Sequence, residues 1–470
     1  MRISLCAAVA AAVLLSGGSA FAGVFDRLEK GPPPRIEVPA VRAEVLENGM
    51  RLFLLEDRTL PMVRVRAIVR AGSAHDPKGK SGLAELSAML VRSGGAGSLS
   101  PDEFDLAVDS LGASVSSSAG RELIEFDLLV LSGDLEKGSS LLFDMMFRPR
   151  LDPKRLSVAR SKIEERLRRE SDDPGTLAGR RLRQLVYGKE SPWARLPDRR
   201  SLRRIKRKHV LAFCENAIRT GDVVIAAAGD FDSQKFVEMI RRLGEGARGG
   251  ESKFPKIPEI DPSFTPGREY VVRPTTQSFV RMGHLGIRRH NPDKFALLLM
   301  NDILGAGNFK SRLMEDIRVD RGMAYSVWSR MTLGTDYGLF VIGVNTKAEQ
   351  TKEAVDLITG HVRRLATGKD ATGPELEFAR RSVLARLVFE FDNAFKVANS
   401  RANFFIHGYP DDYWRVFRDG VSKVTVADVN RVASRYLHPD GLKVVVVGPA
   451  SAKDAERVGG SPEDAGEGGR

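Results

Sequence analysis

The stretch Thr276-Gln277-Ser278-Phe279-Val280-Arg281-Met282-Gly283-His284-Leu285-Gly286 goes furthest toward deciding the fold of this 470-residue chain. Its apolar residues predict a strand over 278–285. An apolar stretch over 292–304 predicts a helix, and residues 336–344 predict another strand. Strands that alternate with helices in this way are typical of an α+β arrangement, in which helices pack on a sheet.

The preceding part of the chain has the same kinds of elements. Residues 61–71 alternate apolar and charged side chains, which predicts a half-buried strand, and residues 122–131 predict a second strand. Residues 81–91 and the strongly charged stretch 153–171 predict helices. Ser100-Pro101 is typical of a helix start, with an N-cap serine and a proline at the first helical position.

The two halves of the chain repeat one another when the sequence is shifted by 220 positions. The shift places residues of the first half on identical residues of the second: Leu156 on Leu376, Ala159 on Ala379, Arg160 on Arg380, Glu170 on Glu390, and Asp172 on Asp392. An ordered set of matches indicates an internal duplication. We therefore predict an α+β fold of two homologous αβ domains, each a mostly antiparallel sheet with helices packed on it.

Composition predicts where the segments begin and end. Two stretches rich in glycine and proline, and a tail rich in Gly, Asp, Glu and Ser, separate the patterned regions. The predicted division is a signal peptide over 1–22, an extended N-terminal arm over 23–42, an N-terminal domain over 43–243, a linker over 244–267, a C-terminal domain over 268–451 and a disordered tail over 452–470.

The first 22 residues predict export. Arg2 precedes an apolar stretch over 5–15, and Ala20-Phe21-Ala22 is an A-x-A cleavage site, so we expect cleavage after Ala22 and a periplasmic location. No later segment approaches the roughly 20 apolar residues that a membrane helix needs. Cleavage leaves Cys214 as the single cysteine, on an apolar helix face where we expect it to be inert.

The formal net charge is +12, and many of the arginines lie in residues 180–208. Nucleic-acid binding is not expected, because the basic residues lack interleaved aromatic side chains and the chain is predicted to be exported. The stretch favours a solvated helix face, or a surface for an acidic partner or peptide.

An ordered string of short motifs carries a family resemblance. It consists of residues 46–50, 82–84, 276–286, 301–305, 311–313, 317–318 and 322–326. With this string the chain resembles the pitrilysin/insulinase-type (M16) zinc peptidases, in the short two-domain form of mitochondrial processing peptidase subunits. The resemblance covers almost the whole mature chain. It implies a half-clamshell that faces a second chain and encloses an unfolded peptide.

The residues that would bind zinc in this family are missing. The family motif is His-x-x-Glu-His, and in Gly82–Met89 the two histidine positions hold Glu85 and Met89 while the glutamate position holds Ala88. A zinc site of this type needs neutral imidazoles to bind the metal and a carboxylate to deprotonate the attacking water, and glutamate, alanine and methionine cannot supply that set. The resemblance implies that Glu165 matches the distal zinc-ligand glutamate of the family. The alternative is that Glu165 is a solvated glutamate beside Glu164 and Arg166. We expect no metal or other cofactor bound by this chain.

No other motif replaces the lost one. The seven histidines, at positions 75, 209, 284, 290, 361, 407 and 438, form no i, i+4 pair. His284 and His290 flank a strand end, where a shared metal is not expected. His407 lies in an apolar segment and is expected to be part of the core.

The second half matches another part of the family site. In paired members the chain without zinc supplies an arginine and a tyrosine that hold the substrate carbonyl, and Arg318 and Tyr325 match them at the same spacing of seven residues. Arginine has fixed, permanently charged donors, and a tyrosine hydroxyl can donate to an oxyanion. The alternative is that both residues serve packing or lie on the surface.

The resemblance leads to three hypotheses. The first is a non-zinc-binding subunit of a periplasmic heteromeric peptidase, which supplies peptide-binding surface, Arg318 and Tyr325 to a zinc-containing His-x-x-Glu-His partner. The second is a non-proteolytic peptide-binding or scaffold protein. The third is a zinc peptidase with non-standard ligands, which would need Glu85, Glu165 and a distant group.

Overall fold

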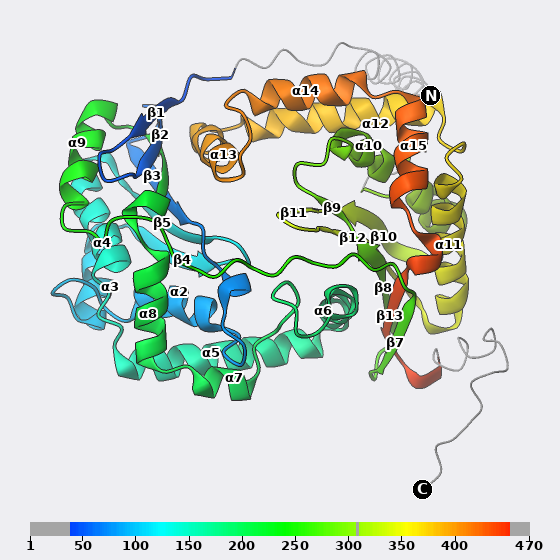
Figure 1. Cartoon of the computed structure of the whole chain (residues 1–470), viewed down its shortest axis with the longest axis horizontal. Coiled ribbons are helices and arrows are strands. Elements are labelled where there is room, and N and C mark those ends of the chain that lie inside the picture. The colour runs from blue at the N-terminus through cyan, green and yellow to red at the C-terminus, as the bar shows by residue number, and fades with distance from the viewer. Residues whose placement is uncertain (1–37, 307–309, 452–470) are drawn as a thin grey trace, which may run out of the picture.

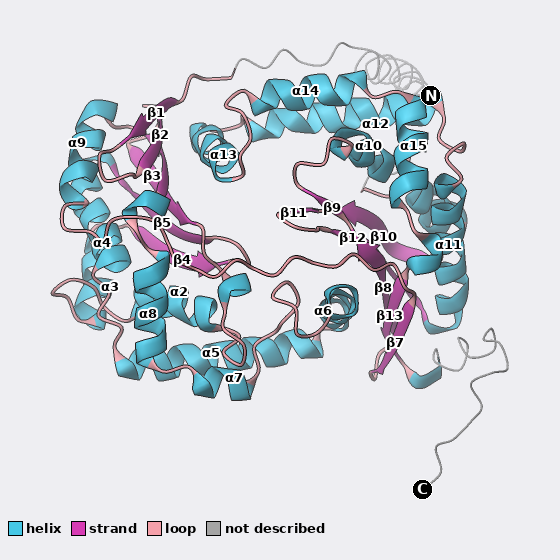
Figure 2. Cartoon of the chain, viewed as in Figure 1, coloured by secondary structure: helices cyan, strands magenta, loops and turns pink. Residues whose placement is uncertain are grey.

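A computed structural model describes residues 38–306 and 310–451. The predicted signal peptide and tail lie outside the described residues, as does most of the predicted N-terminal arm. Two sheets lie on opposite sides of the molecule, and helices cover their outer faces (Figures 1 and 2). The α+β prediction is confirmed.

The first sheet has the strand order β1-β2-β6-β3-β5-β4, and only the β2–β6 pair is parallel. Its strands are β1 Arg42–Val45, β2 Arg51–Glu56, β3 Met62–Val69, β4 Ser114–Ala119, β5 Ile124–Leu131 and β6 Val224–Gly229. Strand β3 shows why they form: Val63, Val65 and Ala67 are fully buried, whereas Arg64 and Arg66 point to the other face.

The helices that form the core with this sheet come from the same half of the chain. They are α2 Leu83–Ser93, α3 Pro101–Ser110, α4 Leu135–Phe147, α5 Pro153–Asp172, α7 Arg199–Arg204, α8 Arg207–Ala217 and α9 Ser233–Leu243. Ser100 and Glu103 form a capping box at the start of α3, as the Ser100-Pro101 signal predicts. Residues 244–266 contain no helix or strand.

The second sheet has the order β10-β12-β8-β13-β7, and only the β13–β7 pair is parallel. Its strands are β7 Gly267–Val272, β8 Gln277–Leu285, β10 Ala324–Met331, β12 Leu339–Lys347 and β13 Lys443–Gly448. A small ribbon pairs β9 Ile287–Arg288 with β11 Leu333–Gly334. The helices around this sheet are α10 Lys294–Leu304, α11 Thr351–Ala366, α12 Gly373–Arg386, α14 Tyr413–Lys423 and α15 Val426–Tyr436, with a π-helix at Met314–Asp320.

The two halves exchange one helix each. Helix α6 (Pro174–Tyr187) belongs to the first half but packs on β8 and β13 of the second sheet. Helix α13 (Ala394–Ile406) belongs to the second half but packs on β2 and β6 of the first sheet. Figure 1 shows each helix lying against the opposite sheet. The exchange buries apolar side chains across the boundary and therefore ties the two halves together.

The strands and helices predicted from sequence are confirmed, with ends that shift by up to three residues. The strand predicted over 336–344 is β12 at Leu339–Lys347, and the helix predicted over 292–304 is α10 at Lys294–Leu304. Cys214 is buried, and burial raises the pKa of its thiol to about 12. Within residues 38–306 and 310–451, every helix is too short or too polar to cross a membrane.

Candidate functional site

Helix α2 carries the degenerate metal motif, and its start is firmly anchored. The buried Asp76 carboxylate accepts hydrogen bonds from the backbone N–H groups of Gly82 (2.7 Å) and Ala84 (2.8 Å). Gly82 precedes the helix with φ of 95°, a left-handed conformation that favours glycine. Burial raises the pKa of Asp76 to about 7, although the helix amides favour the carboxylate. These contacts fix the orientation of α2, and with it the position of Glu85.

A guanidinium contacts Glu85 at the first ligand position of the motif. Arg166 on α5 donates through Nη2 to both carboxylate oxygens of Glu85, at 2.6 Å each. Its Nη1 donates to Glu170 at 2.7 Å, and Arg180 of α6 contacts the same glutamate. The result is a chain of alternating charges from α2 through α5 to α6, in a partly buried setting where such pairs are stronger than at the surface.

The other motif positions offer no ligand and no base. Ala88 is buried, and its carbonyl accepts a hydrogen bond from the Ser117 hydroxyl of β4. Met89 is half-buried and packs against the core of the first half. Both positions therefore serve the attachment of α2 to the first sheet.

Glu165 lies apart from Glu85. Its carboxylate is 54% exposed and is 3.7 Å from the Arg169 guanidinium, one turn along α5. It lines a surface depression together with Pro197 and Arg199. Because successive residues of a helix point about 100° apart, Arg166 and not Glu165 faces α2.

Zinc does not fit these residues. Glu85 is held by Arg166, Ala88 and Met89 supply no ligand suited to zinc, and Glu165 is paired with Arg169. Within the described ranges 38–306 and 310–451, no group of three or more His, Cys, Asp or Glu side chains is arranged to hold a metal ion. We therefore derive no step of chemistry from a metal on this chain.

The same kind of ion pair occurs in the second half. Arg386 at the end of α12 contacts Asp302 of α10, whose side chain is fully buried. Arg386 is the residue 220 positions after Arg166, so the shift that reveals the repeat also aligns the two arginines. In each half, an arginine at the equivalent position of the repeat thus pairs with a carboxylate on a neighbouring helix: Arg166 of α5 with α2, and Arg386 of α12 with α10. The degenerate metal site of the first half therefore holds an ion pair, Glu85–Arg166, that resembles the Asp302–Arg386 pair of the second half.

Arg318 and Tyr325 lie side by side. Arg318 lies in the π-helix Met314–Asp320, and its guanidinium carbon is 5.1 Å from the centre of the Tyr325 ring. This distance is typical of a cation–π contact. Tyr325 is 85% exposed, at the start of β10. The arrangement presents a guanidinium and a phenol hydroxyl together, and single-turn π-helices often occur at functional positions.

The histidines are placed differently from one another. His284 is buried, donates from Nδ1 to the Leu285 carbonyl at 2.7 Å and accepts the His438 N–H at Nε2 (3.3 Å). The expectation that His407 belongs to the core is wrong. His407 follows α13 and lines a cavity of about 680 Å³ between the two halves, because α13 extends across to the first sheet.

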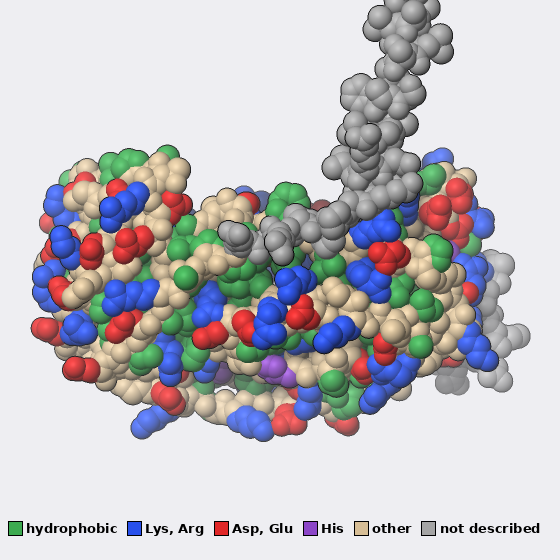
Figure 3. Space-filling model, turned by 90° about the horizontal axis from the view of Figure 1, so that it is seen from above, with side chains coloured by type: hydrophobic (Ala, Val, Ile, Leu, Met, Phe, Trp, Pro, Cys, Tyr) green, Lys and Arg blue, Asp and Glu red, His purple; other side chains and the backbone are tan. Residues whose placement is uncertain are grey.

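The arginines of residues 180–208 do not form one helix face. Arg195 donates to the Asp76 carbonyl at 2.8 Å, and Arg207 donates to the Leu151 carbonyl at 2.9 Å. Arg181 pairs with Glu269 of β7. The face of the molecule seen from above, which is opposite to α6 and α7, likewise has basic and acidic side chains interspersed (Figure 3). Much of the positive charge of this stretch therefore holds helices and loops in place.

Sequence reasoning missed Arg166, although a signal for it existed. The alignment over the family motif pointed to Glu165, one position earlier on the same helix. The internal repeat pairs Arg166 with Arg386, and two arginines at equivalent helix positions would have indicated a shared structural role. No sequence pattern indicated that α6 and α13 exchange sheets.

Comparison with known proteins identifies the family. Residues 52–190 match the family described as insulinase (peptidase family M16), and residues 204–383 match the peptidase M16 inactive domain. The chain belongs to the peptidase M16 family.

The relatives carry different names. A Bacillus subtilis protein named "Uncharacterized zinc protease YmxG" is 23% identical over 416 residues, which cover 87% of this chain and 98% of the relative. A Helicobacter pylori protein named "Non-peptidase homolog YmxG" is 23% identical over 430 residues, covering 90% and 96%. The family therefore includes both chains named as proteases and chains named as lacking that activity.

Solved structures share the fold. A peptidase M16 inactive domain from Pseudomonas fluorescens has a TM-score of 0.80 and 24% identity, and the match covers 88% of this chain and 98% of that one. The periplasmic protease PqqL from Escherichia coli has a TM-score of 0.72 and 18% identity, covering 90% of this chain and 48% of PqqL. This chain thus corresponds to about half of PqqL.

Proposed function

We propose that this protein is the non-zinc-binding subunit of an exported, periplasmic M16-type peptidase made of two different chains. Its partner carries the His-x-x-Glu-His motif and zinc. The two half-clamshells enclose an unfolded peptide, and the partner hydrolyses it. The observation that carries the proposal is the Arg318–Tyr325 pair, in which the tyrosine is highly exposed, on a chain whose first metal-ligand position, Glu85, is held in an ion pair.

In this proposal Arg318 and Tyr325 act on the substrate carbonyl across the shared cavity. The guanidinium supplies permanently charged donors, and the Tyr325 hydroxyl adds a neutral donor. Donors aimed at a developing oxyanion stabilise the transition state more than the ground state. The high exposure of Tyr325 supports this role, because the ring is accessible to a second chain or to a peptide.

The alternative is a peptide-binding or scaffold protein without proteolysis. The relative named as a non-peptidase homolog favours it. The two functions differ in whether a zinc-containing partner gains activity from this chain.

The test is hydrolysis of an unstructured peptide library by the mature chain, alone and mixed with a candidate His-x-x-Glu-His chain. We expect activity in the mixture and none with this chain alone. Arg318→Ala should lower the activity of the mixture about 100-fold, the usual effect of removing an oxyanion donor. Tyr325→Phe should lower it while leaving complex formation intact.

A matched control is Arg321→Ala. Arg321 follows the same π-helix but pairs with Asp316 at 2.7 Å, so its loss should leave hydrolysis nearly unchanged. Binding of peptide without hydrolysis in any mixture would favour the scaffold function. Full activity of the Arg318→Ala mixture would refute the proposed role of the Arg318–Tyr325 pair.

A further inference from the structure

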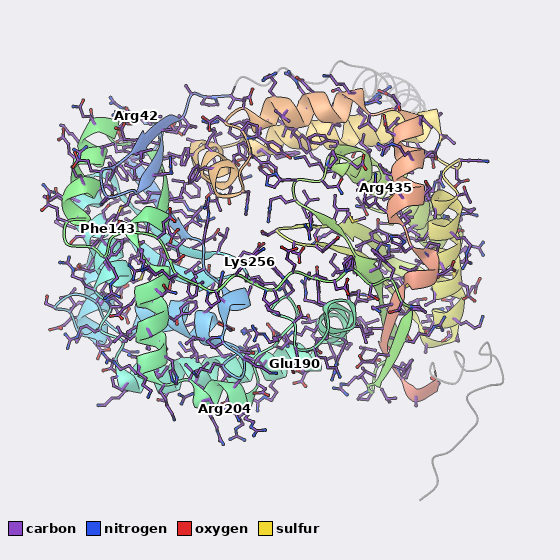
Figure 4. The ribbon with its side chains drawn as sticks, viewed as in Figure 1. Arg42, Phe143, Glu190, Arg204, Lys256 and Arg435 are labelled. Carbon is purple, nitrogen blue, oxygen red and sulfur yellow. The ribbon has the colours of Figure 1, made fainter. Side chains whose placement is uncertain are left out.

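A cavity of about 600 Å³ lies in the first half of the chain, beside the start of α2. Its walls come from the loop before α2, the loop after α6, one side of α8 and the linker between the halves, at residues 74–83, 190–195, 209–216 and 254–258. Figure 4 labels Lys256 on the linker and Glu190 on the loop after α6, which belong to two of these walls. The volume is that of an ordinary small-ligand site. The cavity is distinct from the Arg318–Tyr325 pair, which lies in the second half.

The inner surface of the cavity is apolar and partly aromatic. The ring of Phe254, on the linker, has its centre 4.6 Å from that of His75 and 5.3 Å from that of Phe213 on α8. The linker backbone is held at the same point, because the Lys253 N–H donates to the Asn216 side chain at 2.9 Å. Rings from three segments are thus fixed against one another. They form a surface that can take a hydrophobic side chain.

The rim of the cavity carries ammonium groups without counter-ions. Lys78 and Lys80 line the cavity, and among the residues that the structure describes neither ammonium group has an ion-pair or hydrogen-bond partner. Lys80 is half-buried, and removing a charge from water costs free energy unless an anion compensates it. Loss of solvation and the positive charge of Lys80 lower the pKa of His209, which also lines the cavity. The rim therefore has a positive potential that an anion would relieve.

The acidic groups of the cavity do not neutralise these lysines. The Asp76 carboxylate accepts hydrogen bonds from backbone N–H groups at the start of α2, and Arg195 donates to the Asp76 carbonyl at 2.8 Å. Lys256 pairs with Glu259 at 2.8 Å, and Glu190 is exposed on its loop. An apolar cavity with unpaired ammonium groups at its rim is complementary to a ligand that joins a hydrophobic group to an anion.

We propose that this cavity binds the C-terminal end of a peptide, with the last side chain against Phe213 and Phe254 and the terminal carboxylate at Lys78 and Lys80. At a C-terminus, a single residue carries both a hydrophobic side chain and a carboxylate, which is the combination that the cavity offers to bind. An acidic residue inside a peptide lacks the hydrophobic group. The inference rests on the proposed function in that the ligand is a peptide, and it adds a preference for chains that end in an apolar residue.

A fatty acid carries the same two chemical groups, but the cavity favours a peptide over it. The side-chain NH₂ group of Asn216 lies in the wall and, among the described residues, has no acceptor, because the contact with the linker uses only the amide oxygen. A peptide carbonyl can accept from this group, whereas a hydrocarbon tail cannot.

The test measures binding to the mature chain alone by fluorescence anisotropy. The probes are a labelled eight-residue unstructured peptide that ends in phenylalanine with a free carboxylate, the same peptide with a C-terminal amide, and a free-carboxylate peptide that ends in serine. Decanoate serves as a competitor. We expect the first peptide to bind at least about tenfold more tightly than the other two, with an advantage over the amide that decreases as salt increases.

Four kinds of variant identify the site. Lys78→Gln and Lys80→Gln, alone and combined, should remove the difference between acid and amide while the amide peptide still binds. Ile257→Ser, in the linker wall, should weaken both phenylalanine peptides. Glu190→Gln should strengthen binding of the free-acid peptide, because it removes a like charge from the rim. Lys235→Gln is the matched control, because Lys235 is exposed on α9 at the outer edge of the first half (Figure 1). Thermal melting verifies the folding of each variant, and an unfolded double variant leaves the decision to the two single lysine variants.

The outcomes separate this inference from the proposed function. A difference between acid and amide that is lost in the lysine variants supports the site even if no partner chain ever gains activity. Equal binding of acid and amide, or a difference that survives in the double lysine variant, would overturn it. Tighter binding of decanoate than of the peptide, with the same dependence on Lys80, would overturn the assignment to a peptide. Binding of none of the probes would also overturn it, and hydrolysis of the same peptides by the mixture with a partner chain would then show that the proposed function stands without this site.

Discussion

The Glu85–Arg166 ion pair predicts what is needed to restore a metal site. The perturbation is the triple variant Glu85→His, Ala88→Glu and Met89→His, which restores the family motif. In the unmodified chain, the Nη2 atom of Arg166 lies 2.6 Å from both carboxylate oxygens of Glu85. A zinc ion bound by a side chain at position 85 would lie about 2 Å from its ligand atom, so the guanidinium would stand next to the metal.

The electrostatic penalty is large. Charges of +1 and +2 separated by about 4 Å repel by about 8 kcal/mol at an effective dielectric constant of 20. The Arg166 side chain is 36% exposed and can turn toward water, which reduces the penalty to about 2–3 kcal/mol. That corresponds to about 30- to 150-fold in zinc affinity. Arg166→Glu removes the repulsion and adds a carboxylate on the helix face that meets α2.

The assay is competition for zinc with a chromogenic chelator. We expect the triple variant to bind zinc weakly and the triple variant with Arg166→Glu to bind at least about 100-fold more tightly. Arg169→Glu in the same background is the matched control and should give little gain, because Arg169 faces Glu165. Equal affinities of the triple and quadruple variants would show that Arg166 does not oppose zinc binding, and loss of zinc on Glu165→Gln would show that Glu165 is a ligand after all.

Three further predictions concern stability and reactivity. Arg386→Leu should lower the free energy of unfolding by about 2–4 kcal/mol, because it leaves the fully buried Asp302 without its arginine. Arg166→Leu should lower it by only about 0.5–1 kcal/mol, because Glu85 is 27% exposed. Urea unfolding measures both variants, and equal losses of unfolding free energy would contradict the dependence on burial. Burial lowers the pKa of His284 from 6.5 to about 4, so the folded state favours the neutral imidazole. The contribution of His284 to stability is therefore complete above pH 6.5 and falls by up to about 3 kcal/mol as the pH decreases toward 4. Unfolding curves over a pH series test this: if the His284→Gln variant loses as much stability toward pH 4 as the native chain, His284 is not the cause. Cys214 should react with a thiol reagent only after unfolding, and rapid labelling of the native protein would show that α8 opens locally.

The fold was largely predictable because its local signals agree with its tertiary structure. The alternation in residues 61–71 matches a strand buried on one side, and the Ser100-Pro101 signal matches the capped start of α3. The 220-residue repeat predicted two similar sheets with helices. What it could not predict is that α6 and α13 cover each other's sheets, because an apolar helix face does not specify which of two similar sheets it packs on.

The site was predictable in part. The absence of histidines at positions 85 and 89 is visible in the sequence, and the spacing of Arg318 and Tyr325 predicted two residues that the fold brings into contact. The role of Arg166 depends on which residue of a helix turn faces α2, a difference of one position.

The most direct test of the central claim is the zinc content of the purified mature chain after equilibrium dialysis against micromolar zinc, measured by inductively coupled plasma mass spectrometry. We expect far less than one zinc per chain, with no change on Glu85→Gln. One zinc per chain that is lost on Glu85→Gln would show that Glu85 is a metal ligand and would contradict the claim that Arg166 has taken the place of the metal.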